Sequence, residues 1–322
     1  MTTNNNDKPQ KTAINKILTV MIIQVIIAAI LIFIIILLVL RKPVVEEYVA
    51  VDSSRIYEFY KGGQFIDLDD YTYGKIRVPA LTDVPKHTYN FENLLYDGRF
   101  YSYTEGSQKT SVTGIDVSYF QGSIDWDKVA ADGISFAIIR VGYRGYESGT
   151  VNIDERFDEY VKGAADAGID VGVYFFSQAN SIDEAHEEAD TVINAIKKYN
   201  ITYPVVYDWE ITGNETARTN DIDVETVTDC AVAFCDRISE AGYIPMIYGT
   251  KKCALMKMNM SRLAGYHFWY TAYNEDEPSF PYEFQMWQYA SDGKVDGIDG
   301  DVDLNISFID YSKTKPVSYL SQ

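Results

Sequence analysis

Hydrophobic positions are distributed along this chain in two different ways. Residues 17–40 form one continuous apolar run without a charge, broken only by Thr19 and Gln24 as clearly polar positions. As a helix this run would reach about 36 Å, against a hydrocarbon core of about 30 Å, which predicts one tilted membrane crossing. A cleaved signal peptide is the alternative, but its apolar region is only about 7 to 15 residues long. We therefore expect an uncleaved transmembrane anchor at residues 17–40, preceded by a cytoplasmic tail at residues 1–16.

From residue 112 onward, short apolar runs alternate with segments of helical period. The first five runs, each followed by a helical segment, predict strands at residues 113–117, 136–141, 170–176, 203–207 and 243–248. Three more runs, at residues 267–273, 284–289 and 301–308, follow one another too closely for a crossover helix. Eight mainly parallel strands in about 200 residues predict an α/β fold, a barrel of triosephosphate-isomerase type without its last helices. An open doubly wound sheet is the alternative.

Two of the intervening helices carry clear end signals. Ser181 and Glu184 have the spacing of a capping box, which predicts a helix that begins there and runs through Lys198. The next helix has its apolar face on residues 227–238 and is expected to end at Gly242.

Residues 44–110 differ from both regions, because aromatic residues recur there among acidic ones. The segment 94–103 predicts two short strands around Asp97-Gly98, a strong hairpin signal. We expect residues 44–110 to form a small, β-containing extracytoplasmic stalk that folds but does not catalyse. The catalytic domain is then residues 111–312, active without the stalk when the chain starts at Ser111, and residues 313–322 are a C-terminal tail.

Charge and residue counts narrow the functional classes. The chain of 322 residues has 28 Lys and Arg against 47 Asp and Glu, a formal charge of −19, which argues against nucleic acid as a partner. Its three histidines and three cysteines show no ligand spacing, so we expect no metal site. A Gly-rich phosphate loop is also missing, and no cofactor is expected.

Carboxylates recur at the ends of the predicted strands. Asp116 ends the first strand, Asp208 and Glu210 end the fourth, and Asp303 lies in the last. Because side chains alternate along a strand, Asp208 and Glu210 point to the same side, with Cα atoms about 6.6 Å apart. Ionising both in a partly desolvated site is costly, so one is expected to keep its proton near neutral pH, as a general acid must.

Aromatic residues are expected around the same mouth, where rings and carboxylates together would suit a sugar. The candidates for substrate contact are Tyr174, Tyr207, Tyr248, Trp269 and Trp287. Taken singly, such aromatics are more often core residues. The acids have other interpretations too, as structural ion-pair partners of Arg140 and Arg144 or as solvated side chains.

These motifs together resemble glycoside hydrolase family 25, the lysozyme-type muramidases. The resemblance covers about residues 111–310 and is carried by residues 114–122 (GIDVSYFQG), 124–126 (IDW), 136–140 (FAIIR), 207–210 (YDWE), 287–289 (WQY) and 302–305 (VDLN). It implies a (β/α)5(β)3 barrel and cleavage of the β-1,4 bond from N-acetylmuramic acid to N-acetylglucosamine in peptidoglycan.

The resemblance also implies roles for the four acids. Glu210 would be the general acid, and Asp208 would stabilise positive charge near the anomeric carbon, in our expectation by orienting the substrate's 2-acetamido group. Asp116 and Asp303 would shape the pocket. A catalytically silent peptidoglycan-binding module and a chitinase-like glycosidase remain as alternatives. Because the implied partner, the glycan strands of peptidoglycan, lies outside the membrane, we expect a single-pass cell-membrane protein with its catalytic domain outside the cytoplasm.

Overall fold

The computed structural model describes residues 21, 24, 27–32, 65–70 and 74–314, and the chain divides into two compact units, Met1–Gly63 and Gln64–Gln322. Of the first unit, the structure describes only a few helical residues between 21 and 32. No helix in the described part of the chain is long and apolar enough to span a bilayer. The predicted tail at residues 1–16 and most of the predicted anchor at residues 17–40 lie outside the described residues, as do residues 315–322.

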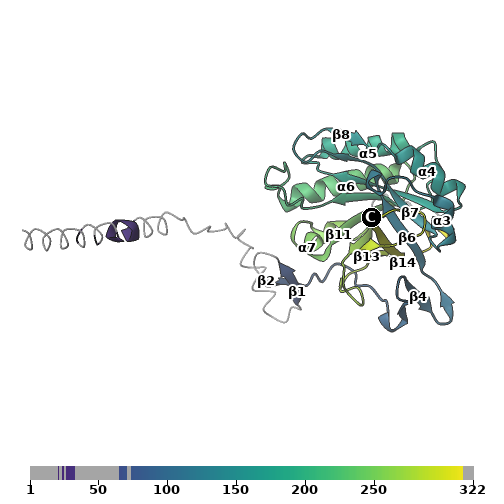
Figure 1. The fold of residues 1–322 in the computed structure, drawn as a ribbon, viewed down its shortest axis with the longest axis horizontal. Coiled ribbons are helices and arrows are strands. Elements are labelled where there is room, and N and C mark those ends of the chain that lie inside the picture. Colours follow the sequence, from purple (N-terminus) through teal and green to yellow (C-terminus); the bar gives the residue numbers. More distant parts are fainter. Residues whose placement is uncertain (1–20, 22–23, 25–26, 33–64, 71–73, 315–322) are drawn as a thin grey trace, which may run out of the picture. The chain divides into compact units, whose positions relative to one another are not determined.

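The centre of the second unit is a closed barrel of eight strands (Figure 1). The ring runs β6-β7-β9-β10-β11-β12-β13-β14, and β14 pairs back onto β6. The bounds are β6 Val112–Val117, β7 Phe136–Arg144, β9 Asp170–Ser177, β10 Val205–Trp209, β11 Pro245–Thr250, β12 His267–Thr271, β13 Met286–Gly293 and β14 Val302–Ser307. A short strand, β8 (Val151–Ile153), pairs with the end of β7. The predicted barrel is confirmed, and closure excludes the open sheet.

One strand of the barrel runs against the others. β14 is antiparallel to both β13 and β6, whereas the remaining neighbours in the ring are parallel. Its first residues therefore reach the end of the barrel where the parallel strands finish, and Asp303 pairs with Asp116 across the last seam. We call this end, where the parallel strands finish and β14 begins, the mouth.

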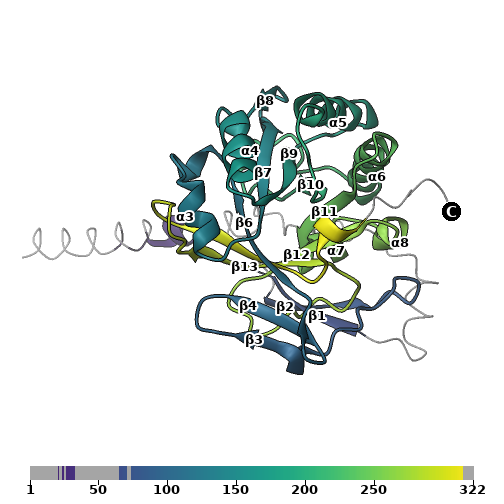
Figure 2. The same ribbon diagram turned by 90° about the vertical axis from the view of Figure 1, so that its right-hand side faces the viewer.

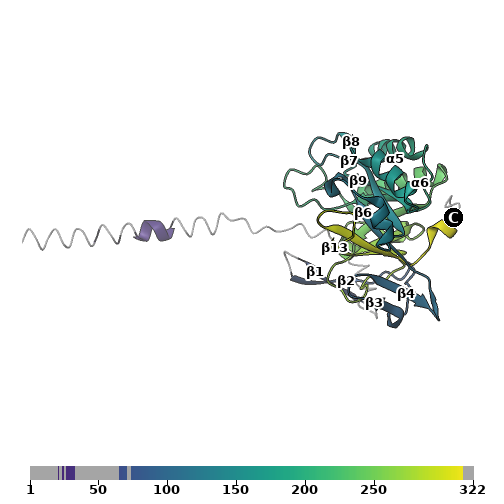
Figure 3. The same cartoon turned by 45° about the vertical axis from the view of Figure 1, so that its right-hand side comes forward.

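Helices cover the strands on one side of the barrel. They are α3 Trp126–Ala131, α4 Phe157–Asp166, α5 Ile182–Ile196, α6 Val224–Glu240, α7 Lys251–Met256 and α8 Met260–Leu263. Figure 3 shows α5 and α6 side by side outside the barrel. The cap predicted for α5 is present, because Ser181 Oγ accepts from the Glu184 N–H at 3.4 Å, but the helix ends at Ile196. α6 ends at Glu240, and Gly242 follows with φ of 86°, a conformation that favours glycine.

Residues before the barrel form two small antiparallel sheets. One consists of β1 Phe65–Asp70 and β2 Gly74–Pro79, and the other of β3 Leu94–Tyr96, β4 Tyr101–Glu105 and β5 Gln108–Lys109. The predicted hairpin is confirmed, because β3 and β4 pair around Gly98, whose φ is 100°. A 3-10 turn, η1 Phe91–Asn93, precedes β3.

The second of these sheets packs on the strands that have no crossover helix (Figure 2). Tyr101 lies 4.8 Å from Trp287 between ring centroids, and Tyr89 stacks on Phe308 at 4.4 Å. The Tyr89 hydroxyl donates to the carbonyl of Phe284 at 2.8 Å. Of the predicted stalk at residues 44–110, the part from Gln64 onward belongs to the same compact unit as the barrel. The aromatic residues that suggested an ordered stalk instead replace the missing helices as a cover.

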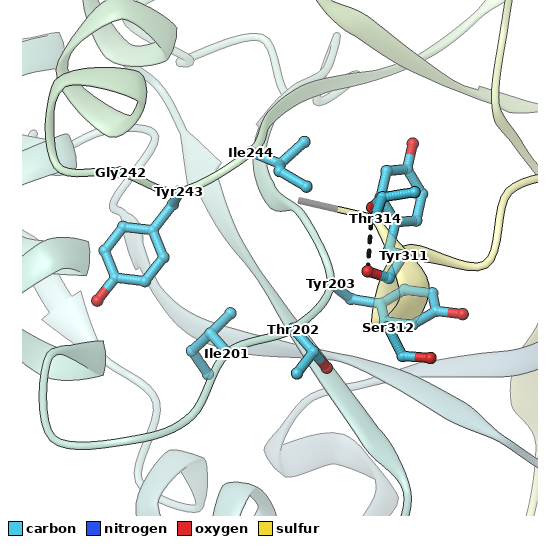
Figure 4. A pocket seen from close by; sticks show the side chains of 9 residues that line it. All are labelled: Ile201, Thr202, Tyr203, Gly242, Tyr243, Ile244, Tyr311, Ser312 and Thr314. Atoms are coloured by element: carbon cyan, nitrogen blue, oxygen red, sulfur yellow. Dashed lines mark hydrogen bonds between the residues drawn. The ribbon is translucent and has the colours of Figure 1, made fainter. Parts of the chain in front are cut away.

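The base of the barrel is closed by aromatic side chains. Tyr203, just before β10, and Tyr311, in the 3-10 turn η3 (Tyr311–Lys313), approach to 5.4 Å between ring centroids. Both line a cavity of about 170 Å³, drawn in Figure 4, together with Tyr243 and Ile244. Tyr203, Tyr243 and Ile244 precede the parallel strands β10 and β11, and Tyr311 follows the antiparallel strand β14, so this cavity lies at the end of the barrel opposite the mouth.

Candidate active site

Strand alternation sends Asp208 to the inside of the barrel mouth and its neighbours to the outside. Asp208 lies in β10 and is 6 % exposed, and Glu210 follows directly after the strand. Tyr207 and Trp209 are fully buried in the core between barrel and helices. The expected same-side placement of Asp208 and Glu210 agrees with the structure, in which each carboxyl group interacts with the other.

Asp116 is held by two amides from the far end of the chain. Its Oδ2 accepts from Gln288 Nε2 at 2.8 Å and from Asn305 Nδ2 at 2.7 Å. Asp116 is 6 % exposed, and both amide side chains are buried. Burial raises the pKa of Asp116 to about 6, although the amides and the Asp303 carboxyl group counteract that rise by hydrogen bonding to it.

The other three carboxyl groups at the mouth also have raised pKa values. Burial raises the pKa of Asp208 well above its usual range, and the charges of Glu210 and Asp116 raise it further. Burial also raises the pKa of Glu210. Asp303 faces Asp116 across the seam, and burial together with the Asp116 charge raises its pKa to about 9. At neutral pH burial therefore favours the protonated forms of Asp208 and Asp303, whereas Asp116, with a pKa of about 6, is largely ionised. We call the carboxyl groups of Asp116, Asp208, Glu210 and Asp303 the site carboxyls.

The pair at the end of β10 shares its proton. The rise in pKa is stronger for Asp208, which is the more deeply buried of the two, and this favours the proton on Asp208. The pair as a whole is thus a store for one transferable proton.

A buried glutamine supports Glu210 from the neighbouring strand. Gln178, just after β9, donates from Nε2 to the Glu210 carbonyl at 3.2 Å and accepts at Oε1 from the Thr219 hydroxyl at 2.6 Å. Gln178 is fully buried. It therefore ties the backbone that carries Glu210 to the loop between β10 and α6.

A buried ion pair and two aromatic rings form one rim of the mouth. Arg140 on β7 donates from Nε to Asp154 Oδ2 at 2.9 Å, and the same carboxylate oxygen accepts from the Tyr119 N–H at 3.1 Å. The Arg140 guanidinium lies 5.1 Å from the Tyr119 ring centroid and 5.5 Å from that of Phe120. The ion-pair interpretation thus applies to Arg140 with Asp154, not with the site carboxyls, although the Arg140 charge lowers the pKa of Asp208.

The five aromatic candidates divide into two groups. Tyr174, Tyr248 and Trp269 belong to the cluster inside the barrel, and Trp269 donates to Asn305 Oδ1 at 2.9 Å. Tyr207 and Trp287 do not lie with them. Tyr207 packs against Phe234 of α6, and Trp287 packs against Tyr101 on the outer face. Each directly precedes an inward-facing residue, Asp208 or Gln288, so alternation turns both rings away from the mouth.

Two residues of the sequence motifs, Gln288 and Asn305, contact the site although the sequence predicted no role for them. Gln288 and Asn305 contact Asp116 directly, and Tyr273 donates to Gln288 Oε1 at 2.7 Å. The signal that could have identified them is the same alternation, because Gln288 and Asn305 are in register across β13 and β14. Within the described residues, no group of His, Cys, Asp or Glu side chains is arranged to hold a metal ion.

Comparison with known proteins extends the similarity beyond these motifs. Residues 115–298 match the sequence model described as Glycosyl hydrolases family 25. Lysozyme M1 of Streptomyces globisporus is 32% identical over 216 residues, which cover 63% of this chain and 70% of that protein. The autolytic lysozyme of Clostridium acetobutylicum is 23% identical over 192 residues, 60% of this chain and 54% of its own.

Among solved structures, the modular autolysin LytC of Streptococcus pneumoniae superimposes with a TM-score of 0.54 at 25% identity. The superposition covers 76% of this chain and 56% of LytC. The chain thus spans little more than half the length of LytC and of the clostridial lysozyme.

Proposed function

The chain belongs to family 25 of the glycosyl hydrolases, and on that premise we propose that it is a muramidase, which hydrolyses the β-1,4 bond between N-acetylmuramic acid and N-acetylglucosamine in peptidoglycan. The observation that carries the proposal is the Asp208–Glu210 pair, two interacting carboxyl groups at the mouth, each with a raised pKa. A purely binding surface has no use for such a pair, because keeping it buried costs stability.

Glu210 acts as the general acid in this proposal. It lies beyond the last residue of β10, less buried than Asp208, and can therefore reach a glycosidic oxygen that enters the mouth. Protonation of that oxygen by Glu210 lets the bond to the anomeric carbon break without the release of an alkoxide.

Asp208 stabilises the positive charge that develops at the anomeric carbon. After its proton has moved to Glu210, Asp208 is a buried carboxylate that orients the N–H of the 2-acetamido group, whose carbonyl oxygen attacks the anomeric carbon. Water then opens the resulting ring and gives a proton back to Glu210. Asp116 and Asp303 complete the polar wall of the pocket, while Tyr174, Tyr248 and Trp269 form its apolar base.

Product analysis tests this function. The chain from Gln64 onward, incubated with purified peptidoglycan, should release fragments whose reducible end is N-acetylmuramic acid, as identified by mass spectrometry before and after borohydride reduction. Reducible ends at N-acetylglucosamine would instead indicate a glucosaminidase. Chitin oligomers serve as the comparison substrate, and turnover of chitin at the rate of peptidoglycan would indicate a chitinase-like enzyme. Release of nothing would leave the binding module as the better interpretation.

For the N-terminal part we propose a membrane anchor at residues 17–40, with the enzyme on the outer side of the cell membrane. The uncharged apolar run supports the anchor, and the location of peptidoglycan outside the membrane supports the orientation. Protease added to intact, wall-stripped cells should then degrade the catalytic domain. Protection of that domain would contradict both the orientation and the wall substrate.

A further inference from the structure

Gln288 lies at the centre of a polar network inside the barrel. Its Oε1 accepts from three hydroxyl groups, those of Tyr248, Thr271 and Tyr273, at 2.8, 2.8 and 2.7 Å. Its Nε2 donates to Asp116 Oδ2 at 2.8 Å. The side chain is only 3 % exposed, so water does not compete for these bonds.

The amide of Gln288 directs its oxygen toward three hydroxyl groups and its NH2 group toward Asp116. Rotation of the amide by 180° would leave two N–H groups to serve three hydroxyl oxygens and would turn the amide oxygen toward the Asp116 carboxyl group. Asn305 is oriented in the same manner, because Trp269 Nε1 donates to its Oδ1 and leaves Nδ2 for Asp116. An indole N–H can only donate, which makes this second orientation unambiguous.

Both amides consequently present N–H groups, and no acceptor, to the same oxygen of Asp116. A protonated Asp116 would have to place its hydrogen on its other oxygen, toward Asp303, to keep these two bonds. Asp303 is hydrogen-bonded to Asp116 and holds its own proton up to a pKa of about 9. Near neutral pH, Asp116 is therefore surrounded by donors alone, which favours the carboxylate.

We propose that Gln288 is a positioning residue that, together with Asn305, holds Asp116 as a carboxylate, and that the charge of Asp116 keeps the transferable proton on the Asp208–Glu210 pair. Gln288 touches none of the reacting atoms and acts through Asp116. The inference about charge stands on the hydrogen-bond geometry, while its consequence for catalysis rests on the proposed function.

The surroundings of Asp116 agree with this role. The ionisable groups that face it and its neighbours come from each side of the mouth: Asp303 on β14, Asp208 and Glu210 at β10, Tyr174 on β9, Tyr248 on β11, Tyr273 after β12, and Arg140 on β7. Of these, Arg140 alone is cationic, and it is paired with Asp154. The charge of Asp116 contributes to the raised pKa of Asp208, Glu210 and Asp303 alike.

The test is the pH dependence of Gln288→Met, a substitution of similar size that removes the amide. Loss of one donor raises the pKa of Asp116, so the acidic limb of the kcat profile should move to higher pH. Asp116 then carries less charge, the Asp208–Glu210 pair loses its proton more easily, and the alkaline limb should move to lower pH. The pH range between the two limbs of the kcat profile should therefore become narrower by about one pH unit or more. KM should change little.

Gln285→Met is the matched control. Gln285 is also buried, at 8 % exposure, and accepts from the Phe268 N–H at 2.8 Å without contact to the site carboxyls. The Gln285→Met variant should be less stable than the wild type, but the width of its kcat pH profile should be unchanged. A Gln288→Met profile that is lower at every pH but unchanged in width would overturn the proposal and leave the muramidase assignment intact.

A second measurement does not depend on an active enzyme. Carbon-13 NMR of wild-type protein labelled at aspartate Cγ, with Asp116 assigned by comparison with Asp116→Asn, should show Asp116 titrating near pH 6 and ionised at pH 7.5. Over the same range Asp303 should remain protonated. A protonated Asp116 at pH 7.5 would refute the inference even if peptidoglycan is the substrate.

Discussion

Burial distinguishes Asp116 and Asp208 from most of the acidic residues described, and the other deeply buried acids, Asp154 and Glu188, are paired with Arg140 and Arg144. Asp116 and Asp208 are each 6 % exposed, whereas Glu215 and Asp292 lie on the surface. The raised pKa values follow from that difference, because a carboxylate in a dry pocket loses its hydration. The protonation of the carboxyl groups at the mouth therefore depends on the exclusion of water. Single substitutions of these groups should show its effect on activity and stability.

Glu210→Gln is expected to keep the shape of the site and remove the acid. The turnover rate should fall by about 10² to 10⁴, while binding of glycan oligomers persists. Asp208→Asn should also be severe, because an amide cannot balance the charge at the anomeric carbon. Turnover of muropeptides and their affinity by calorimetry are the measurements.

Glu215→Gln provides the control, since Glu215 is an exposed residue of the loop after β10. It should be as active as the wild type. Equal activity of Glu210→Gln and wild type would remove Glu210 from the catalytic role.

Asp303→Asn should stabilise the protein at the expense of activity. The pKa of Asp303 is raised from 3.8 to about 9, so the native state holds a proton that the unfolded chain releases. Stability from this group is complete below about pH 4 and is lost as pH rises toward 9. Asparagine has no proton to release, so the variant should not lose stability in this way, and its amide can still donate to Asp116. The melting temperature should therefore rise by about 2 to 5 °C at pH 8.

The gain should be smaller at pH 5, where less of the native-state stability has been lost. Asp292→Asn, at an exposed position, should change the melting temperature at neither pH. A gain for Asp303→Asn that is independent of pH would mean that packing, not the carboxyl proton, is responsible.

At the residue scale, the sequence was informative wherever alternation along a strand was followed through. It placed Asp208 and Glu210 on one side, and the same rule excludes Tyr207, which the aromatic argument had included. What could not be predicted is the connection from Asp116 to Gln288 and Asn305, because these partners are 172 and 189 residues away in the chain. Only the register of the closed sheet brings them together.

At the scale of elements, the barrel depends on a segment that precedes it. A (β/α) barrel normally buries its outer surface under helices, but β13 and β14 receive aromatic residues from β4 and from the chain before it. Strand periodicity predicted these elements well, including the β3–β4 hairpin. It could not show what they pack against, because an apolar face does not specify its partner.

Tyr89→Ala tests this cover. The ring stacks on Phe308 at 4.4 Å and the hydroxyl donates to the Phe284 carbonyl, so its loss should cost about 2 to 4 kcal/mol in free energy of unfolding. Leu95→Ala on β3, at 55 % exposure, should cost less than about 0.5 kcal/mol. Urea denaturation of both variants gives the comparison.

A chain that starts at Ser111 is expected to be unstable or aggregated, contrary to the sequence-based expectation that it would remain active. It would expose the faces of Phe284, Trp287 and Phe308 to water. A chain that starts at Gln64 retains the cover. Equal melting temperatures for the two would show that residues 64–110 add nothing to the barrel.

At the scale of the whole molecule, the net charge of −19 sets how the enzyme meets its substrate. Peptidoglycan carries carboxylates on its peptides, so a strongly acidic protein is repelled over distances of about a Debye length. Raising the ionic strength from about 0.01 to 0.15 M should therefore increase the rate on intact peptidoglycan. The rate on uncharged oligosaccharides should stay constant, and a rate on peptidoglycan that falls with salt would contradict this account.

Closure of the ring by β14 also determines when the site can exist during synthesis. Asp116 is made early in the barrel, but the amide of Asn305 that binds it belongs to the last strand. Such distant pairing is slow to form, and no partial barrel can substitute for it. While the ribosome is still translating residues before β14, the growing chain has the acids of β6 and β10 without the contacts that place them. The proposed muramidase activity would thereby be withheld until the barrel is complete.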